Sequence, residues 1–193
     1  MQKKQENFNY QLAFLQNFKK ILGLTLDNTL FWRTHIDTII PKLSSASFAL
    51  RVVKLFLSQD SLKIVYYSNF LSVMTYGLIF WGNFRYNNIV FRLQERIIRI
   101  IVWIRARDSC REHFNKLKIL PLQSQYILSF LLFVVHNGDY FKVNSEIHNI
   151  NTRNKSNLHL PMSNLSVYQK GKYYSGIKVF SSLHFSNKGP VPR

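Results

Sequence analysis

The chain has 193 residues, enough for one domain or two small ones, and 47% of them are hydrophobic and 15% aromatic. This composition predicts a buried core and excludes a disordered chain. Lysine and arginine number 26 against nine aspartates and glutamates, which gives a formal net charge of +17. A polyanionic partner is the first expectation, because basic groups that neutralise phosphates release condensed counterions. An anionic membrane surface would satisfy the same charge.

The first residues, the cysteine count and the longest apolar run bear on the compartment. The stretch from Met1 to Asn7 is polar and is not followed by an apolar core, which argues against a signal peptide. Cys110 is the single cysteine, so we expect no internal disulfide and a reducing compartment, either nucleus or cytoplasm. The run from Tyr126 to Val135 is about half the ~20 residues that a membrane span needs. We therefore expect an intracellular protein that is not secreted and has no integral membrane segment.

The first third of the chain predicts one strand and one helix. Residues 1–20 form a basic leader, and apolar residues then alternate from Leu22 to Leu26 as in a half-buried strand. From about Thr34 to Val53 the apolar residues recur with helical spacing. Pro41 interrupts this pattern. We favour a regular helix that begins near Pro41, where a first-turn proline is tolerated, over a helix that contains Pro41 and is kinked there.

The middle of the chain predicts four more helices. Ser58 is a candidate N-cap of a helix that ends near Gly77, and residues 87–104 form the clearest amphipathic helix. A short helix capped by Ser109 and a strongly apolar one over residues 123–135 follow. Beyond residue 140 the periodicity fades. The expected fold is mainly α: a bundle of about five helices, preceded by a strand or hairpin and followed by an irregular C-terminal third with a frayed tail.

Arginines on the clearest helix are the sharpest functional candidates. Arg92, Arg96 and Arg99 lie at i, i+4 and i+7, which places them on one face. A solvated amphipathic helix with an ordinary Glu95–Arg99 ion pair is the plainer interpretation, and phosphate binding is the functional one. Two further sets extend the candidate surface: the following loop supplies Arg105 and Arg107, and the first helix supplies Lys42, Arg51 and Lys54.

Other chemistry is weakly supported by the residue pattern. Cys110 and His113 have the spacing of half a zinc site, but no second pair accompanies them. Nothing beside them suggests an oxyanion site for a cysteine nucleophile. The glycines are too scattered for a phosphate-binding loop. We therefore predict no catalytic residue, no metal site and no cofactor for this chain.

Several segments, in this order and spacing, resemble the C-terminal part of a Jockey-like non-LTR (LINE-type) retrotransposon reverse transcriptase. Each is weak alone, and together they cover about residues 20–185. They are Leu22–Asp27 (LGLTLD) with Trp32, His35 and Ile36; Tyr76–Gly82 (YGLIFWG); Leu93–Ile101 (LQERIIRII); Cys110–Phe114 (CREHF) with Leu117–Leu122 (LKILPL); and, more weakly, Thr152–Arg153 with Tyr173–Lys178.

The resemblance implies an organisation and a partner. Residues 21–33 would be the primer-gripping end of the palm, residues 34–105 a thumb-like helical region, and residues 106–140 post-thumb helices. Residues 141–193 would be a polar, weakly structured C-terminal region. In that family the thumb holds the template–primer duplex, which here predicts binding to an RNA–DNA hybrid or duplex. The unmatched leader and the end of the chain suggest a truncated or degenerate copy.

The same family polymerises DNA on an RNA template with Mg²⁺, and this chain lacks the acids for it. Two-metal nucleotidyl transfer needs carboxylates that converge on two cations, which the family supplies from an adjacent Asp-Asp pair and a further aspartate. No two acidic residues of this chain are adjacent. We therefore expect no polymerase activity from the chain itself. Fingers and palm donated by another chain, a translated relic without function, and a basic protein that binds membrane surfaces remain alternatives.

Overall fold

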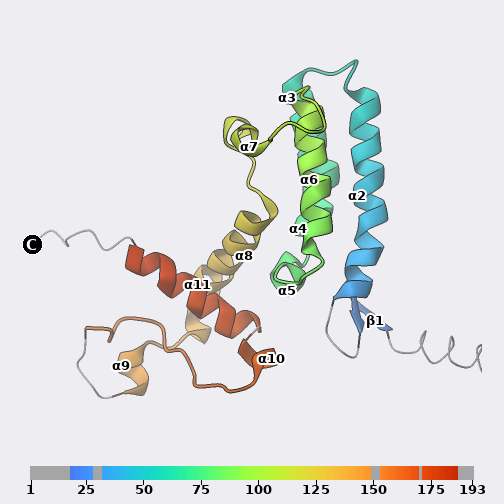
Figure 1. The fold of residues 1–193 in the computed structure, drawn as a ribbon. Helices are drawn as coiled ribbons and strands as arrows, with labels where there is room; N and C mark the ends of the chain where they lie inside the picture. Colours follow the sequence, from blue (N-terminus) through green and yellow to red (C-terminus); the bar gives the residue numbers. More distant parts are fainter. Residues whose placement is uncertain (1–17, 28–31, 149–152, 170, 187–193) are drawn as a thin grey trace, which may run out of the picture. The chain divides into compact units, whose positions relative to one another are not determined.

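The structure is a computed structural model that describes residues 18–27, 32–148, 153–169 and 171–186. It divides into two compact units, Met1–Leu122 and Gln123–Arg193. The described residues are mainly helical, and a single two-stranded antiparallel hairpin precedes the helices (Figure 1). The predicted fold class is therefore confirmed. The expected leader and frayed tail fall almost entirely outside the described residues.

The hairpin of unit 1 joins β1 (Phe18–Ile21) to β2 (Leu24–Asp27). Ile21 pairs with Leu24 at its closed end. Leu22 and Gly23 between them both have positive φ, 49° and 82°, as a two-residue hairpin turn of the favoured hand requires. The alternating pattern of the sequence indicated β2, and the structure adds β1 as its partner.

Helix α2 (Arg33–Val53) corrects the expectation at Pro41. The helix begins well before this proline and contains it. Pro41 lies on the exposed face of α2, where water can solvate the backbone carbonyl that loses its amide partner. The opposite face buries the apolar residues that hold the helix in place, among them Ile36, Leu43 and Leu50. Burial of that face outweighs the broken hydrogen bond.

The second predicted helix is a run of three helical segments. α3 (Gln59–Val65) begins at Ser58, whose hydroxyl accepts the Ser61 amide at 3.3 Å, so the predicted cap is confirmed. A π-helix, η1 (Tyr66–Leu71), and α4 (Ser72–Thr75) follow. Within the π-helix Tyr66 and Phe70 stack with ring centroids 5.6 Å apart, and both are fully buried. These two rings therefore serve the core and are not available to stack on bases.

The remaining helices of unit 1 close its core. α5 (Leu78–Trp81) is followed by α6 (Asn87–Ile101) and α7 (Arg111–Leu117). α2, α6 and the η1–α4 run lie side by side (Figure 1). Six apolar side chains of α6 are buried: Val90, Leu93, Ile97, Ile98, Ile100 and Ile101. The predicted amphipathic helix is thus present, with its apolar face inward.

Unit 2 contains most of α8 (Leu122–His136), a 3₁₀ turn η2 (Gly138–Tyr140), α9 (Asn144–Ile147), α10 (Ser166–Gln169) and α11 (Lys172–Ser186). Its core is Val134, Phe141 and Ile177, with partly buried Tyr173 packed against them. Residues 153–165 are irregular, as expected. The 15-residue α11 was not expected, because its apolar residues follow no clear helical stripe and its partner is found only in the tertiary fold.

No single helix among the described residues is long and apolar enough to cross a membrane. Only α7 and α8 taken together, as a bent pair, have the length and composition that a membrane span needs.

Candidate nucleic-acid interface

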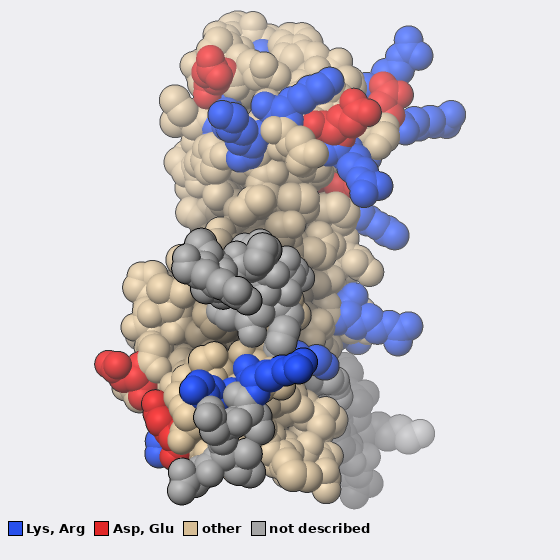
Figure 2. All heavy atoms as spheres, turned by 90° about the vertical axis from the view of Figure 1, so that its left-hand side faces the viewer, with Lys and Arg blue, Asp and Glu red and all other residues tan. Residues whose placement is uncertain are grey.

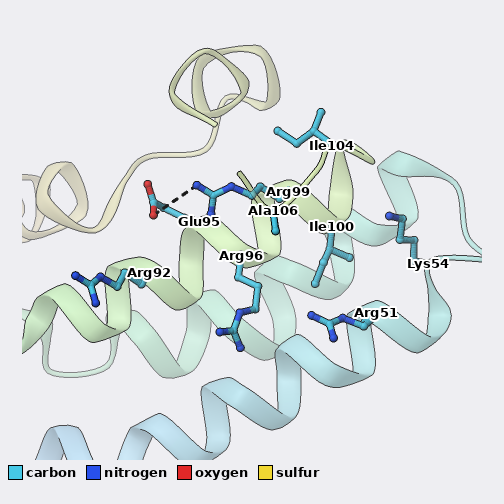
Figure 3. A pocket seen from close by; sticks show the side chains of 9 residues that line it. All are labelled: Arg51, Lys54, Arg92, Glu95, Arg96, Arg99, Ile100, Ile104 and Ala106. Atoms are coloured by element: carbon cyan, nitrogen blue, oxygen red, sulfur yellow. Dashed lines mark ion pairs between the residues drawn. The ribbon is translucent and has the colours of Figure 1, made fainter. Parts of the chain in front are cut away.

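A groove of about 500 Å³ runs along unit 1 between α6 and the C-terminal end of α2 (Figure 3). It brings together five of the eight predicted binding residues, drawn from two separate stretches of the sequence. We call it the basic groove, and it is lined by Arg51, Lys54, Arg92, Glu95, Arg96, Arg99, Ile100, Ile104 and Ala106.

Helix α6 positions one wall of the basic groove. Most of its apolar residues are buried in the core, so the helical period turns Arg92 and Arg96 outward and leaves Arg99 half-buried. The other wall comes from the end of α2, where Arg51 is in the last turn and Lys54 is the C-cap residue. Basic residues are favourable at this end of a helix, because its carbonyl groups carry partial negative charge.

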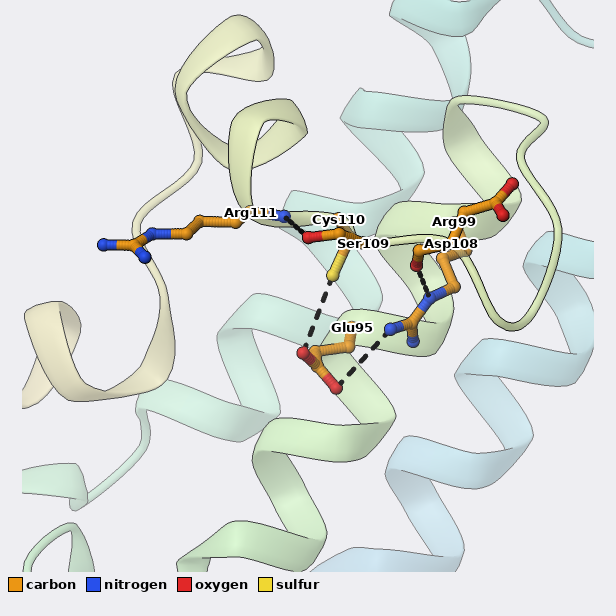
Figure 4. Close-up of polar contacts among 6 residues, drawn as sticks. All are labelled: Glu95, Arg99, Asp108, Ser109, Cys110 and Arg111. Carbon is orange, nitrogen blue, oxygen red and sulfur yellow. Dashed lines mark hydrogen bonds and ion pairs between the residues drawn. The ribbon is translucent and has the colours of Figure 1, made fainter.

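Glu95 is the single acidic residue that lines the basic groove, and it is already engaged. Its carboxylate lies 3.8 Å from the Arg99 guanidinium and accepts the Cys110 thiol at 3.6 Å. Arg99 also donates through Nε to the Asp108 carbonyl at 3.0 Å (Figure 4). These contacts fix the Arg99 side chain against the loop that follows α6, so that it forms a rigid part of the wall.

The Cys110 thiol stays a hydrogen-bond donor in this arrangement. Burial raises its pKa, the positive charge of Arg99 lowers it, and the charge and hydrogen bond of Glu95 raise it again, with a net upward shift. A neutral thiol suits a donor to a carboxylate. The side chain is almost fully buried, so its role here is structural.

Two arginines of the basic groove have no counter-charge. Arg51 extends into the basic groove from α2, and Arg96 extends into it from α6 (Figure 3). Among the described residues neither has a carboxylate within ion-pair distance, and the same holds for Arg92. Like charges that line the same groove repel each other. The basic groove therefore carries a local excess of positive charge.

Trp103 is a member of this region that the sequence did not single out for binding. The Lys54 ammonium lies 4.1 Å from the centroid of its ring, within the range of a cation–π contact. Trp103 has a φ of 60°, an uncommon conformation for a bulky residue, and it is 58% exposed. The contact ties the loop after α6 to the end of α2.

The other predicted binding residues lie outside the basic groove. Arg105 and Arg107 are exposed on the loop after α6, where the Asp108 carboxylate accepts the Arg105 amide at 3.1 Å. Lys42 lines a second cavity of about 300 Å³ on the other part of α2, together with His35 and Tyr76. On the face drawn in Figure 2, lysine and arginine side chains are spread over the surface, with acidic side chains among them. The basic charge is thus widespread, and the basic groove brings five of the predicted residues to one place.

Four of the five segments that carry the family resemblance meet at two places in unit 1; the fifth belongs to unit 2, and its Thr152 lies outside the described residues. At the first, the Thr25 amide donates to His35 Nδ1 at 3.4 Å, and the Tyr76 hydroxyl donates to the Leu22 carbonyl. His35 is 2% exposed, and its pKa is lowered by burial and then by the charge of Lys42. The Trp81 indole also donates to the Tyr76 carbonyl at 3.1 Å. The first two segments therefore form one cluster.

The second meeting point is the side chain of Gln94, which is fully buried. Its amide nitrogen donates to the Tyr66 hydroxyl at 2.9 Å and to the Leu120 carbonyl at 3.0 Å. Its oxygen accepts the Leu122 amide at 2.9 Å. The third and fourth segments are thus joined through one residue, which explains why a glutamine stands on the apolar face of α6.

Comparison of the chain with protein-family models, curated proteins and solved structures gives no match. Within the described residues no group of three or more histidine, cysteine or acidic side chains is placed to hold a metal ion.

Proposed function

We propose that the chain binds nucleic acid, and that the basic groove holds a sugar–phosphate backbone between α2 and α6. More specifically, it would correspond to the palm end, thumb and post-thumb region of a Jockey-like non-LTR retrotransposon reverse transcriptase. The single observation that carries the binding proposal is that Arg51 and Arg96 line the basic groove from two different helices and have no carboxylate partner among the described residues.

The chemistry of the basic groove favours backbone contact over base reading. Guanidinium groups match the geometry of phosphate oxygens and form two parallel hydrogen bonds with them. Contacts to phosphate position a protein on a nucleic acid but carry no sequence information. Binding would therefore be independent of sequence and steeply dependent on salt, and an RNA–DNA hybrid or duplex is the partner that the resemblance suggests.

The proposal includes no catalytic step by this chain. The nine acidic residues of the sequence contain no adjacent pair, and two-metal polymerisation needs converging carboxylates. Polymerisation in a complex would need fingers and palm aspartates from another chain. The basic groove would then hold the duplex and leave the chemistry to that partner.

Binding of the full chain to a labelled RNA–DNA hybrid across a salt series tests the proposal. The variant Arg51→Glu/Arg96→Glu removes this pair. The matched control, Lys142→Glu/Lys155→Glu, changes the net charge equally at two exposed positions of unit 2 that are not among the predicted binding residues. We expect the groove variant to bind at least about tenfold more weakly than the control, and its log–log salt slope to fall by about 0.9 for each phosphate that it no longer neutralises.

Two results would contradict the proposal. Equal losses in the groove variant and the control would mean that net charge alone attracts the nucleic acid. No binding by a folded wild-type chain at low salt would favour a translated relic without a remaining biochemical role.

A further inference from the structure

An apolar stripe lies on the outer face of the last turns of α2, opposite the face that α2 buries in the core, and continues into the turn that follows the helix. Phe48, Val52 and Leu55 recur at helical spacing, and Phe56 follows in the turn before α3; we call these four residues the apolar stripe. All are exposed, Leu55 by 74% and Phe56 by 82%. A cluster of exposed apolar side chains of this size is typical of a surface that contacts another protein, a membrane or an apolar ligand.

Basic and aromatic side chains border the apolar stripe. Arg51 and Lys54 lie within the same turns of chain as Val52 and Leu55. The Lys54 contact with Trp103 places an exposed indole ring beside them. Arg105 and Arg107 follow on the same loop and are also exposed. The acids nearest in sequence are Asp60, on the first turn of α3, and Asp108, whose carboxylate accepts the Arg105 amide.

We infer that the apolar stripe and Trp103 dock onto the surface of an anionic lipid bilayer. Aliphatic and aromatic side chains enter the acyl boundary, tryptophan favours the interface between water and lipid, and lysine and arginine contact anionic headgroups. Val52 and Leu55 offer no ring for stacking on bases, so a nucleic acid would leave half of the apolar stripe without a matching surface. An anionic bilayer matches both features of this surface, the exposed apolar side chains and the basic side chains that border them.

This inference does not depend on the proposed nucleic-acid binding, but the two share residues. Arg51 and Lys54 line the basic groove and also border the apolar stripe. Lipid headgroups and nucleic-acid phosphates would therefore compete for them. The four apolar residues of the stripe and Trp103 do not line the basic groove, so substituting them separates the two activities.

Co-sedimentation of the full chain with vesicles is the test. We expect binding to vesicles that contain phosphatidylserine, at low salt, and no binding to vesicles of phosphatidylcholine alone. The variant Leu55→Ser/Phe56→Ser should lose at least about tenfold in partition and keep its affinity for an RNA–DNA hybrid. The control Met162→Ser/Leu165→Ser, at two exposed apolar positions of unit 2, should partition like the wild type.

Tryptophan fluorescence gives a second readout on the same vesicles. Trp81 is buried and Trp103 is exposed, so an emission shift to shorter wavelength that disappears in Trp103→Phe would place the loop after α6 at the lipid. Absent wild-type binding, or undiminished binding by Leu55→Ser/Phe56→Ser, would overturn the inference. So would a stripe variant that changes the self-association of the chain and leaves its partition into vesicles unaltered, because the apolar stripe would then be a protein–protein interface.

Discussion

Gly77 and Leu24 approach each other so closely that no side chain fits between them. A Cβ atom on Gly77 would lie 2.5 Å from Cδ2 of Leu24, and Gly77 has a φ of 63°. Leu24 begins β2 and Gly77 precedes α5. The contact therefore packs the β1–β2 hairpin against the residue that precedes α5. It also joins the first two segments of the family resemblance.

Gly77→Ala should destabilise unit 1 by about 2 kcal/mol or more, because it adds a steric clash to an unfavourable backbone conformation. Urea unfolding followed by tryptophan fluorescence measures this change in unit 1, where all three tryptophans lie. Gly138→Ala is the matched control, since a Cβ there meets nothing within 4 Å. If the clash is the cause, the double variant with Leu24→Ala should be less destabilised than the sum of the two single variants; simple additivity would assign the loss to the backbone alone.

Gln94→Met should cost about 3 kcal/mol, because it keeps the side-chain volume but leaves the Leu120 carbonyl and the Leu122 amide without their partner. Hydrogen exchange at the Leu122 amide should become faster in the variant. Gln123→Met, at an exposed position, is the control and should change neither quantity. Unchanged exchange at Leu122 would show that the hydrogen bond to Gln94 does not protect this amide.

The sequence predicted well those features that depend only on residues close together along the chain. Ser58 caps its helix through a neighbour three residues away, and the arginine face of α6 follows from the helical period alone. Their physical causes lie within a single turn of chain. The π-helix that buries Tyr66 and Phe70 was missed. A π-helix shifts the hydrogen-bond spacing by one residue relative to an α-helix, and this shift leaves no mark in the apolar pattern when apolar residues are frequent before and after it.

The arrangement of the candidate site depends on tertiary contacts that no local pattern contains. Arg51 and Arg96 line the same groove only because α2 packs beside α6. Lys42, predicted with Arg51 as one patch, lies beside a different cavity, since the residues between them cover several turns of α2. Helix α11 likewise needs Ile177 to be buried against the unit 2 core. The sequence assigned these basic residues to their helices, but which of them lie together depends on how α2 packs against α6.

Cys110 should react slowly with thiol reagents in the folded chain. The side chain is 3% exposed, and burial is the main cause of its raised pKa, while the thiolate is the reactive form. Ellman's reagent should therefore modify native protein far more slowly than urea-unfolded protein at the same pH. The rate in native protein should rise in Gly77→Ala if opening of unit 1 limits it. Rapid modification of the native wild type would contradict the burial of this side chain.

His35 should make unit 1 less stable in mild acid. Burial and the charge of Lys42 hold the pKa of His35 below 6.5 in the folded chain, whereas in the unfolded chain it is near 6.5. As the pH falls, the unfolded chain therefore takes up the proton first. The stability associated with neutral His35 is fully present above pH 6.5 and is lost as the pH falls toward the folded pKa, by at most about 1.4 kcal/mol per pH unit.

A substitution that cannot titrate isolates this contribution from that of the other ionisable groups. His35→Gln should lower stability near neutral pH, since the ring contributes packing and accepts the Thr25 amide, but should remove part of the further decline between about pH 6.5 and about pH 5. His136→Gln, at an exposed position, is the control and should leave the decline unchanged. Urea midpoints at both ends of this range, read by tryptophan fluorescence, give the comparison. An equal decline in His35→Gln and wild type would mean that the proton taken up on unfolding belongs to another group, and that the lowered pKa of His35 has no consequence for the stability of unit 1.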